Sequence, residues 1–290
     1  MNRIPRPAFF DDHAALEALA KNKRAASHPH LIAYVAAIRA GYAQYVAANG
    51  DAHAIAPVVL PPQIETYLRG HYGSPPKAVA YIDEIRSRGG VAVCPMCGSM
   101  GSGTLDHVLP KTSHAAFAIF GLNLVPACKC NSLRSTALTG QNPGERVLHP
   151  YFDDVLGQRL LAGRFDDLGP APRVSLRILL PAGHPLLPAV RFHVENVVER
   201  TQVKDYLHRS WCRLIGGPGR TTVELRKDPL TRDALVEILA RELERCDAAF
   251  EGCNNWDSLF MIAVLEDHVI DWLFDRFSRP GRAAGDALLV

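Results

Sequence analysis

Hydrophobic residues recur at helical spacing over much of the N-terminal part of the chain. The clearest case is the segment 76–89, in which Ala78, Ile82 and Ile85 fall at i, i+4 and i+7 while charged residues occupy the other faces. This spacing predicts an amphipathic helix with one buried stripe. Further helices, separated by proline-containing segments, are expected at residues 14–23, 30–48 and 63–68.

The C-terminal half combines two strand-like runs with longer helical stretches. At residues 190–194 apolar and polar side chains alternate, which is typical of a half-buried strand, and residues 174–180 form a second run of this kind. The proline-containing loop between them favours a hairpin. Helices are expected at residues 133–138, 201–215, 233–245 and 257–277. These patterns predict a mainly helical α+β fold.

Four cysteines form two closely spaced pairs in the middle of the chain. Cys94 and Cys97 are separated by two residues, and Cys128 and Cys130 by one. Soft thiolates bind zinc well, and two short turns can direct four sulfurs at one tetrahedral ion. The spacing therefore predicts a structural zinc site with no open coordination position. Buried apolar packing and redox pairing are the alternatives for these cysteines.

Between the two pairs lie residues able to do chemistry. Asp106 and His107 stand within the run Leu-Asp-His-Val-Leu-Pro-Lys, Asn123 precedes Leu-Val-Pro, and Asn131 directly follows the last cysteine. Framed by the cysteine pairs, this series resembles the HNH family of nucleases over residues 94–136. One difference is the single residue between Cys128 and Cys130, where the family usually has two.

The resemblance implies a small zinc-stapled ββα-metal core, in which two strands and one helix hold a catalytic Mg²⁺ or Mn²⁺. It gives His107 the role of general base, Asp106 and Asn131 the role of ligands to that cation, and Asn123 the role of orienting the histidine loop. An imidazole is largely neutral at neutral pH and able to accept a proton, and carboxylate and amide oxygens suit a hard cation. For Asn131, capping of the following helix is the alternative.

Basic side chains near this motif are candidates for nucleic-acid contact. Lys111 and Arg134 stand where they can meet phosphates, and Lys129 is a weaker candidate. Exposed basic side chains are also commonly solvated without a partner, so that alternative stays open. Outside the motif, His149 is expected to be a satisfied histidine in an aromatic anchor, and Asp153 with Asp154 to form a turn or helix cap.

The motif divides the chain into three regions. We expect a helical N-terminal region at 1–90, the HNH core at 91–140, and an α+β, mostly helical C-terminal region at 141–290. A unit the size of the core buries too little apolar surface to fold unaided, so metal–thiolate bonds are expected to supply the missing stability.

Charge and cysteine usage limit the classes of function. The net charge of +2 and the pI of about 8.2 give only a weak general attraction for polyanions, so any nucleic-acid surface must be local. Seven cysteines, an odd number, fit a reducing compartment better than a disulfide framework. The opening residues lack the apolar core of a signal peptide, and no apolar run is long enough to span a bilayer. A cytoplasmic protein without membrane contact is expected.

The expected function is that of a metal-dependent endonuclease that hydrolyses DNA. The motif also resembles bacterial HNH proteins of anti-phage defence, including the Septu-type nuclease, which implies an ATPase partner. Cutting both strands with one site per chain favours a homodimer. The alternative is a zinc-stabilised scaffold that binds nucleic acid or protein without cleaving it, although such a module needs only the cysteines.

Overall fold

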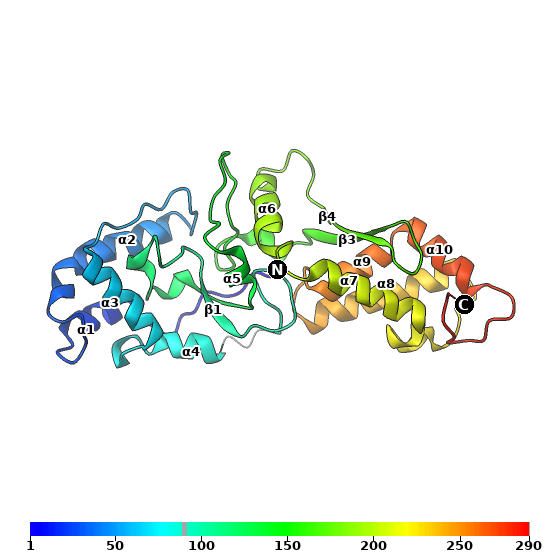
Figure 1. The fold of residues 1–290 in the computed structure, drawn as a ribbon, viewed down its shortest axis with the longest axis horizontal. Coiled ribbons are helices and arrows are strands. Elements are labelled where there is room, and N and C mark those ends of the chain that lie inside the picture. Colours follow the sequence, from blue (N-terminus) through cyan, green and yellow to red (C-terminus); the bar gives the residue numbers. More distant parts are fainter. Residues whose placement is uncertain (89–91, 290) are drawn as a thin grey trace.

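The computed structural model describes residues 1–88 and 92–289 and has an elongated shape (Figure 1). The N-terminal helices lie at one end, the cysteine-containing segment in the middle, and the C-terminal helices at the other end. The described residues form helices and two small antiparallel sheets, as expected for a mainly helical α+β chain. The helix end at residue 89 and the region boundary at 90–91 lie outside the described residues.

Four helices make up the N-terminal end. They are α1 (Asp12–Lys21), α2 (Val35–Ala47), α3 (Pro62–Gly73) and α4 (Tyr81–Arg88). The carboxylate of Asp11 caps α1 by accepting hydrogen bonds from two backbone N–H groups of its first turn. In α4 the predicted stripe is present, because Ile82 and Ile85 are buried. The segment before α4 forms a single 3₁₀ turn, Lys77–Val79, so the regular helix starts later than the pattern indicated.

A β-hairpin and a short helix follow. Strand β1 (Thr104–His107) pairs antiparallel with β2 (Leu124–Ala127). Helix α5 spans Cys130–Arg134, and the helix predicted at residues 133–138 is wrong beyond Arg134. Ser135 adopts a left-handed φ of 56°, which turns the chain out of the helix.

The hairpin and the N-terminal helices share one hydrophobic core. This cluster contains residues from the helices, from both strands and from the loop that joins the strands, among them Leu68, Ile82, Leu105, Phe117, Phe120 and Leu124. Their burial removes a large apolar area from water, which is the main force holding the hairpin against the helices. A second, smaller cluster surrounds the cysteines.

The C-terminal end is built on a second hairpin covered by helices. Its elements are β3 (Leu161–Asp166), β4 (Arg173–Ile178), α7 (Val203–Gly216), α8 (Arg232–Ala249), α9 (Trp256–Val264) and α10 (Asp267–Phe277). Helix α6 (Leu187–His193) follows β4 and lies near α5 in the middle of the molecule (Figure 1). Helix α9 packs on β3 so closely that a Cβ at Gly163 would lie 3.0 Å from the carbonyl oxygen of Leu259. A larger residue at this position would therefore push α9 and β3 slightly apart.

The strand predicted at residues 190–194 is wrong, because these residues form α6 and the π-helical turn Val194–Val198 that continues it. Strand β4 does coincide with the other predicted run, but its partner is β3. The buried Val190, Val194 and Val197 recur at i, i+4 and i+7, so helical spacing outweighs the short alternation. The helix predicted at 257–277 is two helices, α9 and α10, separated at Glu266, which has an extended backbone.

Candidate metal centre and catalytic hairpin

The four predicted cysteine ligands converge. Their sulfur atoms all lie within 4.8 Å of one another, with 3.7 Å between Cys94 and Cys130 and 3.4 Å between Cys97 and Cys128. Four sulfurs around one zinc at about 2.3 Å lie about 3.8 Å apart, so the cluster has the size of a tetrahedral site. The four cysteines could therefore hold a metal such as zinc, and the one-residue spacer does not prevent convergence.

The backbone around the sulfurs is shaped for this arrangement. Gly98 closes the first cysteine turn with a φ of 80°, and its N–H donates to the Cys94 carbonyl at 2.8 Å. A Cβ at Gly98 would lie 2.2 Å from the carbonyl oxygen of Asn254, so only glycine fits. The backbone N–H of Cys128 points at the sulfur of Cys94 at 3.3 Å, and such bonds stabilise a thiolate.

Side chains from the C-terminal region form hydrogen bonds with the turn that carries Cys94 and Cys97. The Nε2 of His193 bonds the Met96 carbonyl at 2.6 Å, and the indole N–H of Trp256 donates to the Cys97 carbonyl at 2.9 Å. The Nδ1 of His193 accepts from the backbone N–H of Leu148, so Nε2 carries the proton. Sequence patterns do not indicate these contacts, because the residues lie about a hundred positions or more from the turn in sequence.

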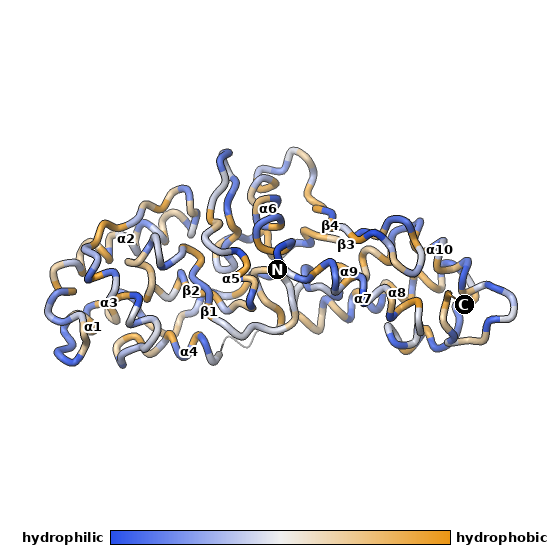
Figure 2. The backbone as a smooth tube through the Cα atoms, viewed as in Figure 1, coloured by the Kyte–Doolittle hydropathy of each residue, from blue (hydrophilic) through white to orange (hydrophobic). Residues whose placement is uncertain are grey.

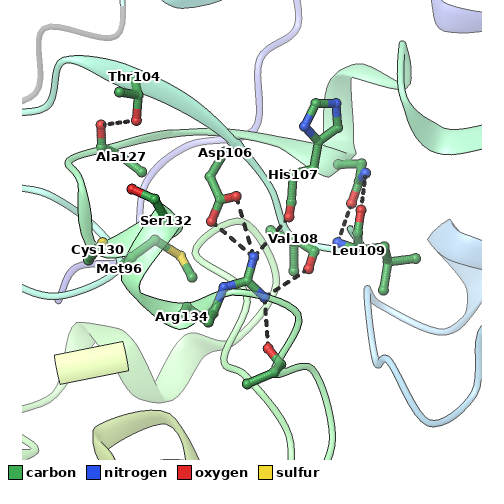
Figure 3. Close-up of polar contacts among 12 residues, drawn as sticks. Met96, Thr104, Asp106, His107, Val108, Leu109, Ala127, Cys130, Ser132 and Arg134 are labelled. Carbon is green, nitrogen blue, oxygen red and sulfur yellow. Dashed lines mark hydrogen bonds and ion pairs between the residues drawn. The ribbon is translucent and has the colours of Figure 1, made fainter. Parts of the chain in front are cut away.

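Asp106 is buried and ion-paired with Arg134, as Figure 3 shows. The Arg134 Nη2 lies 3.1 Å and 3.3 Å from the two carboxylate oxygens, and the guanidinium also donates to the carbonyls of His107, Val108 and Ala137. Burial raises the pKa of Asp106 to about 6, although the charge of Arg134 acts in the opposite direction. This arrangement ties the end of α5 to β1.

The placement of Arg134 corrects its role as a phosphate-contact candidate. Its side chain is 1% exposed and its charge is matched by Asp106, so it is not available at the surface. The same contact bears on the expected Mg²⁺ or Mn²⁺ site. Asp106 and Asn131 offer suitable oxygen donors, but both Asp106 oxygens face a guanidinium, so the residues as arranged do not form a preformed divalent-cation site.

His107 projects away from Asp106, as expected for neighbouring residues of a strand (Figure 3). Its Nε2 lies 2.9 Å from the carbonyl oxygen of Ala118. A carbonyl can only accept, so Nε2 carries a proton and Nδ1 carries the lone pair of the neutral ring. Burial lowers the pKa of His107 to about 4, which keeps the imidazole neutral at neutral pH.

Asn123 is fully buried, and both polar atoms of its side chain form hydrogen bonds with the loop that follows His107. Its Oδ1 accepts from the backbone N–H of Leu109 at 2.8 Å, and its Nδ2 donates to the carbonyls of Leu109 and Phe117. The hydroxyl of Tyr45 donates to the same Oδ1 at 3.1 Å. These bonds fix both ends of the loop, including the segment that carries Ala118.

His149 supports this network from the C-terminal side of the hairpin. It is buried, its Nδ1 accepts from the backbone N–H of Tyr151, and its Nε2 lies 2.8 Å from the Tyr45 hydroxyl and 3.1 Å from the Leu122 carbonyl. The expectation of a satisfied, packed histidine is confirmed. Asp153 stands at the N-cap position of the 3₁₀ turn Asp154–Gly157, in line with the expected turn or cap, but its carboxylate forms a buried two-pronged ion pair with Arg146 and does not cap the turn.

Asn131 and Lys111 lie nearer the surface. Asn131 is half-buried in the first turn of α5, and no side chain caps this helix. Within residues 1–88 and 92–289, the Asn131 side chain has no hydrogen-bond partner. Lys111 is half-buried, and its ammonium lies 4.4 Å from the ring centroid of Tyr72.

Tyr72 on α3 is a contact of His107 that the sequence did not reveal. The two rings meet edge to face with centroids 4.2 Å apart, and the tyrosine hydroxyl donates to the Leu105 carbonyl at 2.7 Å. Tyr72 precedes His107 by 35 positions, and no pattern in the sequence connects them. Only the packing of α3 against the hairpin brings them together.

Part of the chain is similar in sequence to a phage protein. The chain is 32% identical to Protein ea31 of Escherichia phage lambda over 80 residues, which is 27% of this chain and 26% of the phage protein. The match therefore covers about a quarter of each protein. No family model matches the chain, and no solved structure matches it.

The hydropathy of the helices bears on the expectation of no membrane contact. Hydrophobic and hydrophilic residues are mixed along all parts of the chain (Figure 2). Among the helices that the structure describes, none has both the length and the apolar character needed to cross a bilayer.

Proposed function

We propose that this chain is an HNH-type endonuclease that hydrolyses phosphodiester bonds of DNA in the cytoplasm, with His107 as general base. The observation that carries the proposal is the bond between His107 Nε2 and the Ala118 carbonyl. It fixes the tautomer whose Nδ1 can take a proton from water. The neighbouring cluster of four cysteines favours the same function, because a metal bound there would fasten the hairpin to α5, as the resemblance implies.

The proposed chemistry assigns one step to the imidazole. Nδ1 removes a proton as the water oxygen attacks phosphorus, and the bond from phosphorus to the departing sugar oxygen breaks. A ring with a pKa of about 4 is almost entirely in the base form at neutral pH, although it is a weaker base than an ordinary histidine. Asn123 is a positioning residue here, because it holds the loop that orients the ring.

A divalent cation is the second component of the proposed chemistry. Mg²⁺ or Mn²⁺ bound by Asp106 and Asn131 would offset negative charge on the phosphate. Such binding requires Asp106 to share or leave its contact with Arg134. We therefore expect cleavage to depend on added Mg²⁺ or Mn²⁺, with no requirement that the cation be bound before the substrate.

Cleavage of plasmid DNA tests the proposal. The purified full chain is incubated with Mg²⁺ or Mn²⁺, beside His107→Ala and the matched control His208→Ala, which changes a histidine on α7 that contacts Cys212. Nicking or linearisation by the parent and the control, with none by His107→Ala, supports the proposal. Equal cleavage by His107→Ala removes His107 from the chemistry.

A zinc-stabilised binding scaffold is the second candidate. It is favoured by the Asp106–Arg134 ion pair, which commits the expected metal ligand, and by the opposite directions of the Asp106 and His107 side chains (Figure 3). This candidate predicts DNA or protein binding without cleavage under any divalent cation. The plasmid assay therefore separates the two functions.

A role in anti-phage defence beside an ATPase partner, and action as a homodimer, belong to the same proposal. They rest on the resemblance of the motif and on the low net charge of the whole chain. A chain with so little positive charge attracts DNA only weakly, so a partner protein would supply further contacts with the phosphates. Co-purification from the native host, followed by measurement of the assembly mass, tests both. A monomer that elutes alone and cleaves at full rate contradicts them.

A further inference from the structure

We propose that Arg86 and Lys111, which lie on the ring of Tyr72, and Arg69, three residues before Tyr72 on α3, bind the backbone phosphates of a nucleic acid that passes His107. These four residues are called the Tyr72 surface. The inference rests on the proposed function, which puts the reacting phosphate at His107. It extends that function by assigning part of the substrate binding to the N-terminal helices.

Tyr72 packs against the hairpin formed by β1 and β2. Its hydroxyl donates to the carbonyl of Leu105, two residues before His107 on β1, and its ring contacts the His107 imidazole edge to face. These two contacts set the position of the ring relative to His107. Groups that sit on this ring therefore have a defined position relative to the proposed base.

Two cations lie on that ring. The Lys111 ammonium is 4.4 Å from the ring centroid and the Arg86 guanidinium carbon is 5.5 Å from it. Cations at such distances are attracted by the ring face. Arg86 comes from α4 and Lys111 from the loop after β1, so the ring joins two segments of the chain.

Arg69 precedes Tyr72 by three positions on α3, so the two side chains lie on the same face of the helix and Arg69 adds a third positive charge there. Partial burial lowers the pKa of the Lys111 ammonium, and the fields of Arg69 and Arg86 act in the same direction. Gathering like charges costs free energy in the free protein. A bound anion would remove that cost.

The carboxylates nearby leave this charge incompletely balanced. Arg69 pairs with Glu65 and Arg86 with Asp83, each within one turn of its own helix. Within residues 1–88 and 92–289, Lys111 forms no ion pair. Pairs within one turn of an exposed helix contribute little stability, so the arginines can exchange these carboxylates for phosphate.

Phosphate is the anion that this position favours. A strand whose reacting phosphate lies at His107 carries further phosphates on either side, and these need cations at a fixed distance from the base. Arginine forks and lysine ammonium groups are the usual partners of backbone phosphates. Because the net charge of the whole chain is low, a local cluster of positive side chains indicates where a nucleic acid could bind.

DNA binding without added Mg²⁺ or Mn²⁺ tests the inference. The full chain is titrated with a short labelled DNA duplex over a range of salt concentrations. Adding Arg69→Gln, Arg86→Gln and Lys111→Gln together should weaken binding about tenfold or more, and lower the salt slope by about 1 for each phosphate that is no longer neutralised. Lys111→Arg alone should retain binding, because it keeps the charge.

The matched control carries Arg173→Gln, Arg232→Gln and Lys204→Gln, which remove two arginines and one lysine from exposed ion pairs of the C-terminal region. It should bind as tightly as the parent. The inference is overturned if the Tyr72-surface variant folds, as judged by circular dichroism, and keeps the affinity and salt slope of the control.

The two proposals fail separately. If the parent chain cleaves no DNA but the Tyr72-surface variant alone loses binding, the nuclease assignment fails and the binding surface stands. If the parent cleaves and the Tyr72-surface variant binds normally, the nuclease stands and this surface is rejected.

Discussion

The guanidinium of Arg134 lies 3.1 Å from the carboxylate of Asp106, and both side chains are almost completely buried. A buried ion pair depends on both members, because removing one leaves an uncompensated charge in a medium of low polarity. Arg134 also serves three backbone carbonyls, so its loss leaves them without a donor. The pair is thus a structural bond between α5 and β1 and a constraint on any cation at Asp106.

Replacing Arg134 with Ala should lower the free energy of unfolding by about 3–5 kcal/mol, as expected for breaking a buried pair. Chemical denaturation measures this change. Arg241→Ala is the control, since Arg241 forms an exposed pair with Glu224 and its loss should have little effect. A variant at position 134 as stable as the control would show that the ion pair is not structural.

Removing the metal should unfold the region around the four cysteines. We expect elemental analysis to find one zinc per chain, and Cys128→Ser to abolish its retention and lower the melting temperature. Cys212→Ser serves as the control, because Cys212 is exposed and lies on α7. Purified protein that contains no thiophilic metal and is unaffected by chelators would contradict the assignment.

Asn123→Ala should be destabilising out of proportion to its size. The substitution leaves the N–H and the carbonyl of Leu109 without their partner, and each unsatisfied buried group costs about 1–3 kcal/mol. The Phe117 carbonyl loses one of its two hydrogen bonds and keeps the one from the Phe120 N–H. If the variant still folds at low temperature, its cleavage rate should fall while DNA affinity is kept. Asn196→Ala, which removes a single bond to a helix carbonyl, is the comparison.

His149 should make stability depend on pH. Burial lowers its pKa to about 3, below the value of 6.5 in the unfolded chain. The stability that the neutral, buried His149 contributes is therefore fully present above pH 6.5. It is lost as the pH falls toward 3, because in that range only the unfolded state takes up the proton. Denaturation between pH 7 and pH 5 should show a loss that approaches about 1.4 kcal/mol per pH unit from this residue.

His149→Gln isolates that contribution. The variant should be less stable at pH 7 but lose less stability on acidification than the parent, since glutamine does not titrate. Other buried groups titrate equally in both proteins and cancel in the comparison. Identical pH dependence in parent and variant would mean that His149 is not held neutral by burial.

The order of elements in the central region could be predicted from sequence, and so could the convergence of the cysteines. Two close cysteine pairs on either side of a hairpin leave few geometries, and the helical periodicity around Ile82 and Ile85 is strong enough to identify α4. The strand prediction at 190–194 fails because five residues fit both an alternating strand and one side of a helix. Burial of Val197, beyond that window, favours the helix.

The sequence by itself determined the local chemistry of this protein, namely most of its helices and the side chains that carry sulfur, imidazole and carboxylate groups. The tertiary structure alone decided how those groups are used. It pairs Asp106 with Arg134, sets the tautomer of His107 through a hydrogen bond to the Ala118 carbonyl, and packs Tyr72 against the imidazole. The physical reason is that burial and hydrogen-bond partners depend on segments far apart along the chain, which periodicity and spacing do not encode.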